Sequence, residues 1–262
     1  MARQARLDGY GTVVAVGGDG TISEVMNGLA QATPPGESVG KLGLLPLGTG
    51  NDFADMVGCA RQLEQAARVI AAGKTRRIDL GHAVVRTGDQ TIQRYFDNNM
   101  GVGFEACVTL ESYKIKRLPG ALLYVVAALR ALNSYRPPHM DIQWKTANHE
   151  DGQHAEKTLM VSIGNSARTG GSFYLTPDAK MDDELLDVGI AKAISPLRVL
   201  FLLPKALFGK HTTHSALTMV RCRQLQISCA EGLPVQLDGE VIAKQADRVE
   251  ITIQPGRLEV IV

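Results

Sequence analysis

The apolar positions in the first part of the chain alternate between two periodicities. Residues 12–16 form a short β-branched run that ends in a glycine-rich turn at 17–21, and apolar residues then recur at helical spacing over 22–29. A second apolar run at 41–46 leads into the polar segment LGTGND at 47–52, whose Asn or Asp can cap a following short helix. This strand–turn–helix pattern, used twice, predicts an α/β unit with parallel strands.

The pattern changes near Lys74. Before it, apolar residues over 63–70 predict one more helix, with Gly73 at its carboxyl end. After it, alternating runs dominate, with turn signals at 87–89 and 151–152. We therefore place a domain boundary there.

Two helical stretches interrupt the strand-rich region. They cover residues 105–133, with a break expected at Pro119, and residues 196–208, with a break or kink expected at Pro204. The sequence thus predicts an α/β nucleotide-binding domain at residues 1–75. A larger antiparallel β-sandwich with helical insertions is predicted at residues 76–262.

Composition limits the classes of function. The 262 residues are 45% hydrophobic and 21% charged, which favours a folded core over disorder. A formal net charge of +1 supplies no overall field for nucleic acid, so we expect no nucleic-acid partner. The longest apolar run, residues 121–129, is too short to span a bilayer, and the first residues contain no apolar signal-peptide core. These features predict a cytoplasmic protein.

The glycine turn at 17–21 is a candidate phosphate site. A glycine-rich turn before a helix can direct several backbone N–H groups at an anion, although a tight turn alone also explains glycine. Asp19 would repel a bare phosphate unless a metal ion lay between them. We therefore interpret the turn as a site for a Mg²⁺–nucleotide.

Six short motifs follow one another in an order typical of one enzyme family. They are GGDGT at 17–21, LGTGND at 47–52, IDLG at 78–81, GVGFEA at 101–106, DELLD at 183–187 and LDGE at 237–240. Together they resemble the diacylglycerol kinase catalytic-domain family, the bacterial lipid kinases related also to sphingosine and ceramide kinases. The resemblance covers nearly the whole chain and implies a nucleotide domain like that of NAD kinases. GGDGT alone is also similar to NAD kinases and phosphofructokinases, whereas the later motifs favour a lipid kinase.

The resemblance implies where ATP and Mg²⁺ bind. The residues it places along the ATP phosphates are Gly17, Gly18, Asp19, Gly20, Thr21, Ile22, Ser23 and Thr49. It also implies that Asp19, Asp52 and Asp79 surround a catalytic Mg²⁺, directly or through water. Such a cation neutralises charge on the β and γ phosphate oxygens. From the residues alone, Asp52 could equally be a helix cap and Asp79 a polar group at a strand end.

The resemblance assigns Glu240 as the general base. It follows a strand-like run and a turn at Asp238 and Gly239, which would place its carboxylate at a loop tip facing a cleft. There it would take the proton from the attacking lipid hydroxyl. The alternative is an ordinary hairpin turn with a solvated acid.

A second cation site is implied in the loop at 180–185. The resemblance places a structural Mg²⁺ there, bound by the Asp183 carboxylate and by the backbone carbonyls of Lys180 and Leu185. Oxygen ligands suit a hard cation. The chain departs from the family pattern at Glu184, where glycine is usual, and an acidic surface turn is an equal alternative.

Two segments combine basic and apolar residues as a membrane-contacting surface would. In the first, Lys114, Lys116 and Arg117 precede an apolar helix; in the second, Arg198, Lys205 and Lys210 flank one. Ordinary helices packed on a sheet would look similar. Peripheral membrane contact is therefore a hypothesis.

The resemblance also implies about one more βαβ unit upstream of residue 1. Without it, open strand edges would invite association, and we expect a homodimer to be accessible. The function predicted is an ATP- and Mg²⁺-dependent kinase that phosphorylates a hydroxyl of diacylglycerol or a related membrane lipid alcohol in the interdomain cleft. The alternatives are a kinase of a soluble substrate resembling NAD kinase, and a non-catalytic nucleotide or lipid sensor.

Overall fold

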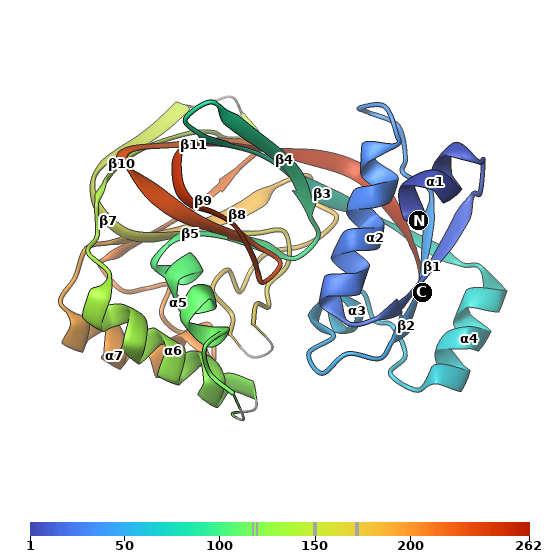
Figure 1. The fold of residues 1–262 in the computed structure, drawn as a ribbon, viewed down its shortest axis with the longest axis horizontal. Coiled ribbons are helices and arrows are strands. Elements are labelled where there is room, and N and C mark those ends of the chain that lie inside the picture. The colour runs from blue at the N-terminus through green and yellow to red at the C-terminus, as the bar shows by residue number, and fades with distance from the viewer. Residues whose placement is uncertain (117, 119, 149–150, 171–172) are drawn as a thin grey trace.

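The computed structural model describes residues 1–116, 118, 120–148, 151–170 and 173–262. Its helices are α1 (Ala2–Leu7), α2 (Asp19–Gln31), α3 (Asp52–Met56), α4 (Leu63–Ala72), α5 (Phe104–Ser112), α6 (Gly120–Ser134) and α7 (Pro196–Ala206). Its strands are β1 (Thr12–Gly17), β2 (Lys41–Pro46), β3 (Thr75–Thr87), β4 (Gln90–Phe96), β5 (Asn99–Gly103), β6 (His139–Lys145), β7 (Asp151–Gly164), β8 (Leu186–Lys192), β9 (Leu217–Cys222), β10 (Gln224–Leu237) and β11 (Glu240–Ile261). The predicted fold class, a small α/β part followed by an antiparallel sandwich with helical insertions, is confirmed (Figure 1).

The α/β part is built on two parallel strands. β1 pairs with β2 from Thr12 opposite Lys41 to Gly17 opposite Pro46, and α2 and α4 lie on opposite sides of the pair (Figure 1). Met26 and Leu29 of α2 pack with Leu42 and Leu44 of β2 in one buried core. β1 is the last strand at this end of the sheet. Association of two copies of the chain through its edge stays a prediction, which sedimentation of the protein would test.

The sandwich part is antiparallel. Strand order runs β11, β10, β5, β7, β8, β9, with β4 attached through β3, and β6 pairing with both β10 and β7. The inner faces share a second buried core. Helices α5, α6 and α7 lie together beside the sandwich, over a third, smaller core that includes Phe104, Ala128 and Val199 (Figure 1).

Two details differ from the sequence-based expectations. Pro204 lies inside α7, which continues two residues beyond it to Ala206, so the chain does not break there, and a kink stays a prediction. Asp151 and Gly152 open strand β7 instead of forming a turn, and Gly152 faces Trp144 of β6, where a Cβ would meet the indole. Gly88 makes the expected turn between β3 and β4, whereas Pro119 lies outside the described residues.

Strands β3 and β11 belong to both large cores. Ile78 and Leu80 of β3 are buried in the α/β core, and Ala83 and Val85 of the same strand are buried in the sandwich core. β11 likewise passes from the sandwich to the α/β part, where Glu259 pairs in parallel with Lys41 of β2. The division at residues 75 and 76 stays a prediction, and it falls at the first residue of β3. None of the helices in the described ranges is long and apolar enough to cross a membrane.

Candidate active site

The two glycine-rich loops of the α/β part touch each other. A Cβ added to Gly48 would lie 2.4 Å from the Cα of Gly18, and one added to Gly18 would lie 2.9 Å from the Cα of Gly48. Only glycine fits at this crossing, and the close approach sets the end of β1 beside the end of β2. By contrast, a Cβ at Gly20 would meet nothing, so packing alone does not require glycine at the start of α2.

A cavity of about 800 Å³ opens beside these loops and has two kinds of lining. Its polar residues come from the glycine loops, from β5 and from the hairpin between β10 and β11; they include Asp19, Thr49, Asp52, Asn99, Asp238 and Glu240. Its apolar residues come mainly from α5, α6, α7 and β7; they include Phe104, Leu123, Ala128, Leu159, Val199 and Leu203. The cavity therefore offers a polar region and an apolar region to one ligand.

Asp19 and Asp52 reach the cavity from neighbouring helix starts. Asp19 Oδ1 accepts the backbone N–H of Phe53 at 3.1 Å, so this carboxylate caps α3 from another helix. The expected cap, Asn51, has the N-cap position, but its side chain instead bonds the backbone of Gly48. Together with Glu240, three of the four predicted acids therefore lie at the polar lining.

Arg168 links the acids of α3. Its Nε lies 2.8 Å from Asp52 Oδ1, its Nη1 lies 2.9 Å from Asp55 Oδ2, and it also lines the cavity. Its guanidinium balances the charge of both carboxylates. Together with Arg61, it holds the pKa of Asp55 below its usual range.

The residues predicted along the ATP phosphates divide into two groups. Asp19, Gly20 and Thr49 line the cavity, and so does Gly50, which had not been assigned. The others, Gly17, Gly18, Thr21, Ile22 and Ser23, do not line it. Ile22 is a core side chain, 1% exposed. A phosphate contact at these positions would therefore need their backbone N–H groups.

Asp79 does not reach this cavity. Its two carboxylate oxygens accept the backbone N–H groups of Gly256 and Glu184, each at 2.7 Å, and burial raises its pKa. It holds the start of β3 to the chain segments on either side. Both Asp79 oxygens thus accept backbone N–H groups, and its place beside a catalytic Mg²⁺ stays a prediction.

Glu240 lines the cavity at the tip of the hairpin between β10 and β11, as the sequence predicts. Its Oε2 accepts a hydrogen bond from Arg94 at 2.7 Å, and its side chain is 62% exposed. The turn before it is held from two sides. Gln236 Oε1 accepts the N–H of Gly239 at 2.8 Å, and the Tyr113 hydroxyl donates to the Gly239 carbonyl at 2.7 Å.

Asp238 anchors the same hairpin to the junction of β4 and β5. Its carboxylate accepts three consecutive backbone N–H groups, from Asp97, Asn98 and Asn99, at 3.0 to 3.2 Å. Burial raises the pKa of Asp238 to about 6, and burial together with the nearby acids raises that of Asp97 well above its ordinary value. The hairpin that carries Glu240 is therefore fixed by a buried carboxylate.

In the loop at 180–185, Asp183 is engaged within the protein. Its Oδ1 accepts the N–H of Leu185 at 3.2 Å, and its Oδ2 pairs with Arg221. Glu184 adopts a positive φ of 62°, as its unusual place in the motif suggests, and pairs with Arg223. A cation bound by Lys180, Asp183 and Leu185 stays a prediction.

The metal chemistry of the cavity follows from its donors. Within the described ranges, no group of three or more His, Cys, Asp or Glu side chains is placed to hold a metal ion. Mg²⁺ usually takes one or two carboxylates and completes its shell with substrate phosphates and water. The pair Asp19 and Asp52, beside an open glycine loop, fits that requirement.

Glu105 is a site residue that had no predicted role. It lies on α5 inside the GVGFEA motif, lines the cavity and is only 9% exposed. It accepts hydrogen bonds from Asn99 Nδ2 at 2.8 Å, from Gln236 Nε2 at 3.1 Å and from the Ser162 hydroxyl. Burial raises its pKa to about 7. The sequence did carry one signal for Glu105, because it is the acidic residue in an otherwise apolar motif.

The raised pKa of Glu105 predicts a pH-dependent stability. Between its ordinary pKa of 4.5 and about 7, the folded protein keeps a proton that the unfolded chain has lost, so the free energy of unfolding falls as pH rises through this window. By pH 8 the Glu105 proton accounts for a loss of unfolding free energy on the order of 3 kcal/mol, compared with pH values below 4.5. Urea unfolding at a series of pH values should show a shallower decline for Glu105→Gln than for wild type. Glu64→Gln, at an exposed position of α4, is the control; equal slopes for all three proteins would refute the assignment.

Comparisons with known proteins show the family of this chain. Residues 1–83 match the model of the diacylglycerol kinase catalytic domain, and residues 98–262 match that of the YegS C-terminal NAD kinase beta sandwich-like domain. A probable lipid kinase YegS-like protein of Pseudomonas aeruginosa is 33% identical over 99% of this chain and 79% of its own length. A diacylglycerol kinase of Bacillus subtilis is 31% identical over 91% of this chain and 74% of its own length.

Two solved structures share the fold. A diacylglycerol kinase from Bacillus anthracis superposes with a TM-score of 0.69 at 20% identity, covering 99% of this chain and 80% of that one. A yeast NADH kinase complexed with NADH superposes with a TM-score of 0.56 at 12% identity, covering 99% and 64%. At these identities the likeness is one of fold.

Proposed function

Because this chain belongs to the diacylglycerol kinase family of lipid kinases, we propose that it transfers the γ-phosphoryl group of ATP to a hydroxyl of a membrane lipid alcohol, with Mg²⁺ as cofactor. The observation that carries the proposal is the two-sided lining of one cavity. Asp19, Asp52 and Glu240 line it together with apolar side chains from α5, α6 and α7.

The nucleotide side of the proposal rests on the glycine loops. Gly20, Thr49 and Gly50 leave room along the cavity for phosphate oxygens, beside the carboxylates of Asp19 and Asp52. A Mg²⁺ ion bound there supplies charge neutralisation on the phosphates during transfer. Asp19 and Asp52 would hold that ion from two different loops. Arg168, now paired with Asp52, is near enough to the same region to contact a phosphate group.

The acceptor side of the proposal rests on Glu240 and the apolar lining. The lipid hydroxyl oxygen forms the new bond to the γ-phosphorus, the bond from that phosphorus to the bridging oxygen breaks, and ADP leaves. Glu240 takes the hydroxyl proton. An acyl chain would lie against Phe104, Leu123 and Leu203, where burial of apolar surface holds the lipid in place.

The test is transfer from radiolabelled ATP to lipid alcohols in mixed micelles, with and without Mg²⁺, beside NAD as a soluble acceptor. We expect labelled lipid phosphate that requires Mg²⁺. Label in NAD without label in lipid would favour a soluble-substrate kinase. Tight ATP binding without any transfer would favour a sensor. Either outcome would refute the proposed function.

We also propose that α7 contacts the membrane from which the lipid is taken. Leu197 and Phe201 on α7, and Phe208 just after its end, are exposed at 68%, 77% and 73%. Arg198, Lys205 and Lys210 are exposed along the same segment and would favour anionic headgroups. The inner face of the helix lines the cavity through Val199, Leu202 and Leu203. One helix thus joins a lipid-facing surface to the lipid site.

Replacing Phe201 and Phe208 by Ser tests this surface. Neither side chain lines the cavity, so we expect binding to vesicles of phosphatidylcholine with phosphatidylglycerol to weaken by at least roughly tenfold. Vesicle flotation measures this binding. Leu63→Ser, which removes an exposed apolar side chain from α4, is the control. Unchanged flotation of the double variant would contradict a role for α7.

In the first basic segment, Lys114 pairs with Glu111, and Arg117 lies outside the described residues.

A further inference from the structure

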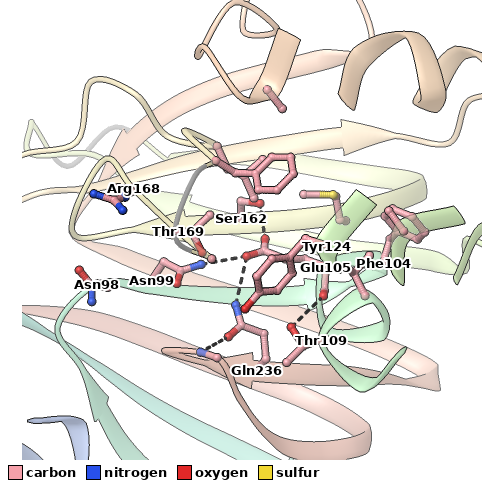
Figure 2. Close-up of a pocket in the computed structure, with 18 of the residues that line it drawn as sticks. Asn98, Asn99, Phe104, Glu105, Thr109, Tyr124, Ser162, Arg168, Thr169 and Gln236 are labelled. Atoms are coloured by element: carbon pink, nitrogen blue, oxygen red, sulfur yellow. Dashed lines mark hydrogen bonds between the residues drawn. The ribbon is translucent and has the colours of Figure 1, made fainter. Parts of the chain in front are cut away.

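A buried polar cluster interrupts the apolar lining of the cavity. Figure 2 shows the Glu105 carboxylate with Asn99, Gln236 and Ser162 directed toward it, and all four residues line the cavity. They are among the most buried polar residues of the chain, at 2% to 9% exposure. Polar groups this deep in a lipid-binding cavity need a physical reason, because an apolar side chain would accommodate an acyl chain better.

The cluster has an unused acceptor position. A carboxylate offers about four lone-pair sites. Glu105 Oε1 accepts two hydrogen bonds, from Asn99 and Gln236, whereas Oε2 accepts one, from the Ser162 hydroxyl. One lone pair of Oε2 therefore has no donor among the bonds formed within the described chain, and the Ser162 oxygen can itself accept. A donor on a bound ligand could complete the set.

The surrounding backbone is shaped to keep this cluster in place. A Cβ at Gly101 would lie 2.4 Å from Glu105 Cδ and 2.8 Å from Gln236 Nε2, so glycine provides the space. Gln236 also links the cluster to the proposed site of transfer, because its Oε1 accepts the N–H of Gly239, the residue before Glu240. One side chain thus bonds both the Glu105 carboxylate and the turn that carries Glu240.

We propose that Glu105 and Ser162 form a subsite for a second hydrogen-bond donor on the acceptor lipid, such as a hydroxyl or amide N–H next to the hydroxyl that is phosphorylated. This inference rests on the proposed function and narrows its substrate class. A lipid alcohol with two neighbouring donors should be favoured over one with a single hydroxyl. A site built to bond a polar group discriminates against ligands that lack it, because its own buried groups are then left without partners.

Two ether lipids that differ by one donor test the subsite. They are 1-O-hexadecylglycerol and its 2-O-methyl derivative, offered in mixed micelles with ATP and Mg²⁺ at about pH 8, where Glu105 is mostly ionised. We expect wild-type kcat/KM to favour the first by at least about tenfold, the effect of one hydrogen bond to a charged group. Glu105→Gln and Ser162→Ala should bring that ratio toward one, whereas Ser112→Ala, a buried hydroxyl of α5 outside the cavity, should keep it.

The outcomes separate the subsite from the proposed function. Transfer to both lipids at equal rates by wild type, or an unchanged ratio in both Glu105→Gln and Ser162→Ala, would overturn the subsite while the kinase stands. Transfer to neither lipid, nor to diacylglycerol, would overturn the proposed function and the subsite with it. Because the ratio compares two substrates on one protein, a loss of folded enzyme does not alter it.

Discussion

Glu240→Gln should lower kcat for lipid phosphorylation by roughly 10²- to 10⁴-fold, the usual contribution of a general base. The amide keeps the size of the side chain but cannot take up the proton of the attacking hydroxyl. Since Glu240 is 62% exposed and its main partner is Arg94, we expect the melting temperature to change little. Radiolabelled transfer to lipid, with ATP binding measured separately, checks both statements.

Arg94 provides the companion variant. Arg94→Met removes the cation at 2.7 Å from Glu240 but leaves the carboxylate in place, so transfer should persist. If Glu240→Gln turned lipid over at close to the wild-type rate, Glu240 would have no part in the proton transfer. The hairpin would then be a structural turn only.

Asp52→Asn is expected to have the next largest effect. If Asp52 helps to hold Mg²⁺ at the phosphates, its loss removes a preorganised charge, and kcat should fall by roughly 10² to 10³. The Mg²⁺ concentration needed for half-maximal activity should rise as well. A Mg²⁺ titration of the kinase reaction at saturating ATP measures both quantities.

Asp55→Asn is a matched control on the same helix. Both acids pair with Arg168, but only Asp52 lines the cavity. We expect Asp55→Asn to keep the wild-type requirement for Mg²⁺, although the contact with Arg61 is also lost. Equal shifts in the two variants would mean that the contact with Arg168, and not metal binding, accounts for the effect.

Local patterns were enough to predict much of the fold and part of the site. The glycine turns at 17–21 and 47–52 mark chain reversals after strands, and the structure explains two of these glycines by the contact between Gly18 and Gly48. Asp19, Asp52 and Glu240 follow such turns, where side chains gather at one edge of the strands. The glycine turn itself pointed to Asp19, whereas Asp52 and Glu240 were assigned from the family resemblance, and all three line the cavity.

What the patterns could not supply depends on partners distant in sequence. Asp79 lies inside strand β3, and backbone N–H groups from residues 184 and 256 donate to its oxygens. Arg168 lies in no recognised motif and reaches Asp52 only through the fold. Glu105 is held in the cavity by a hydrogen bond from Gln236, which lies 131 positions later in the sequence. Local periodicity carries no information about such pairings.

The long strands β3 and β11 have a mechanical consequence. Each runs from one core into the other, and the two strands are paired over residues 75–86 of β3 and 248–261 of β11, with a register irregularity between Gln254 and Leu258. Bending between the α/β part and the sandwich would have to break hydrogen bonds between β3 and β11. We therefore expect the lobes to melt as one cooperative unit, and ligand entry to depend on movement of peripheral helices, with little hinge closure.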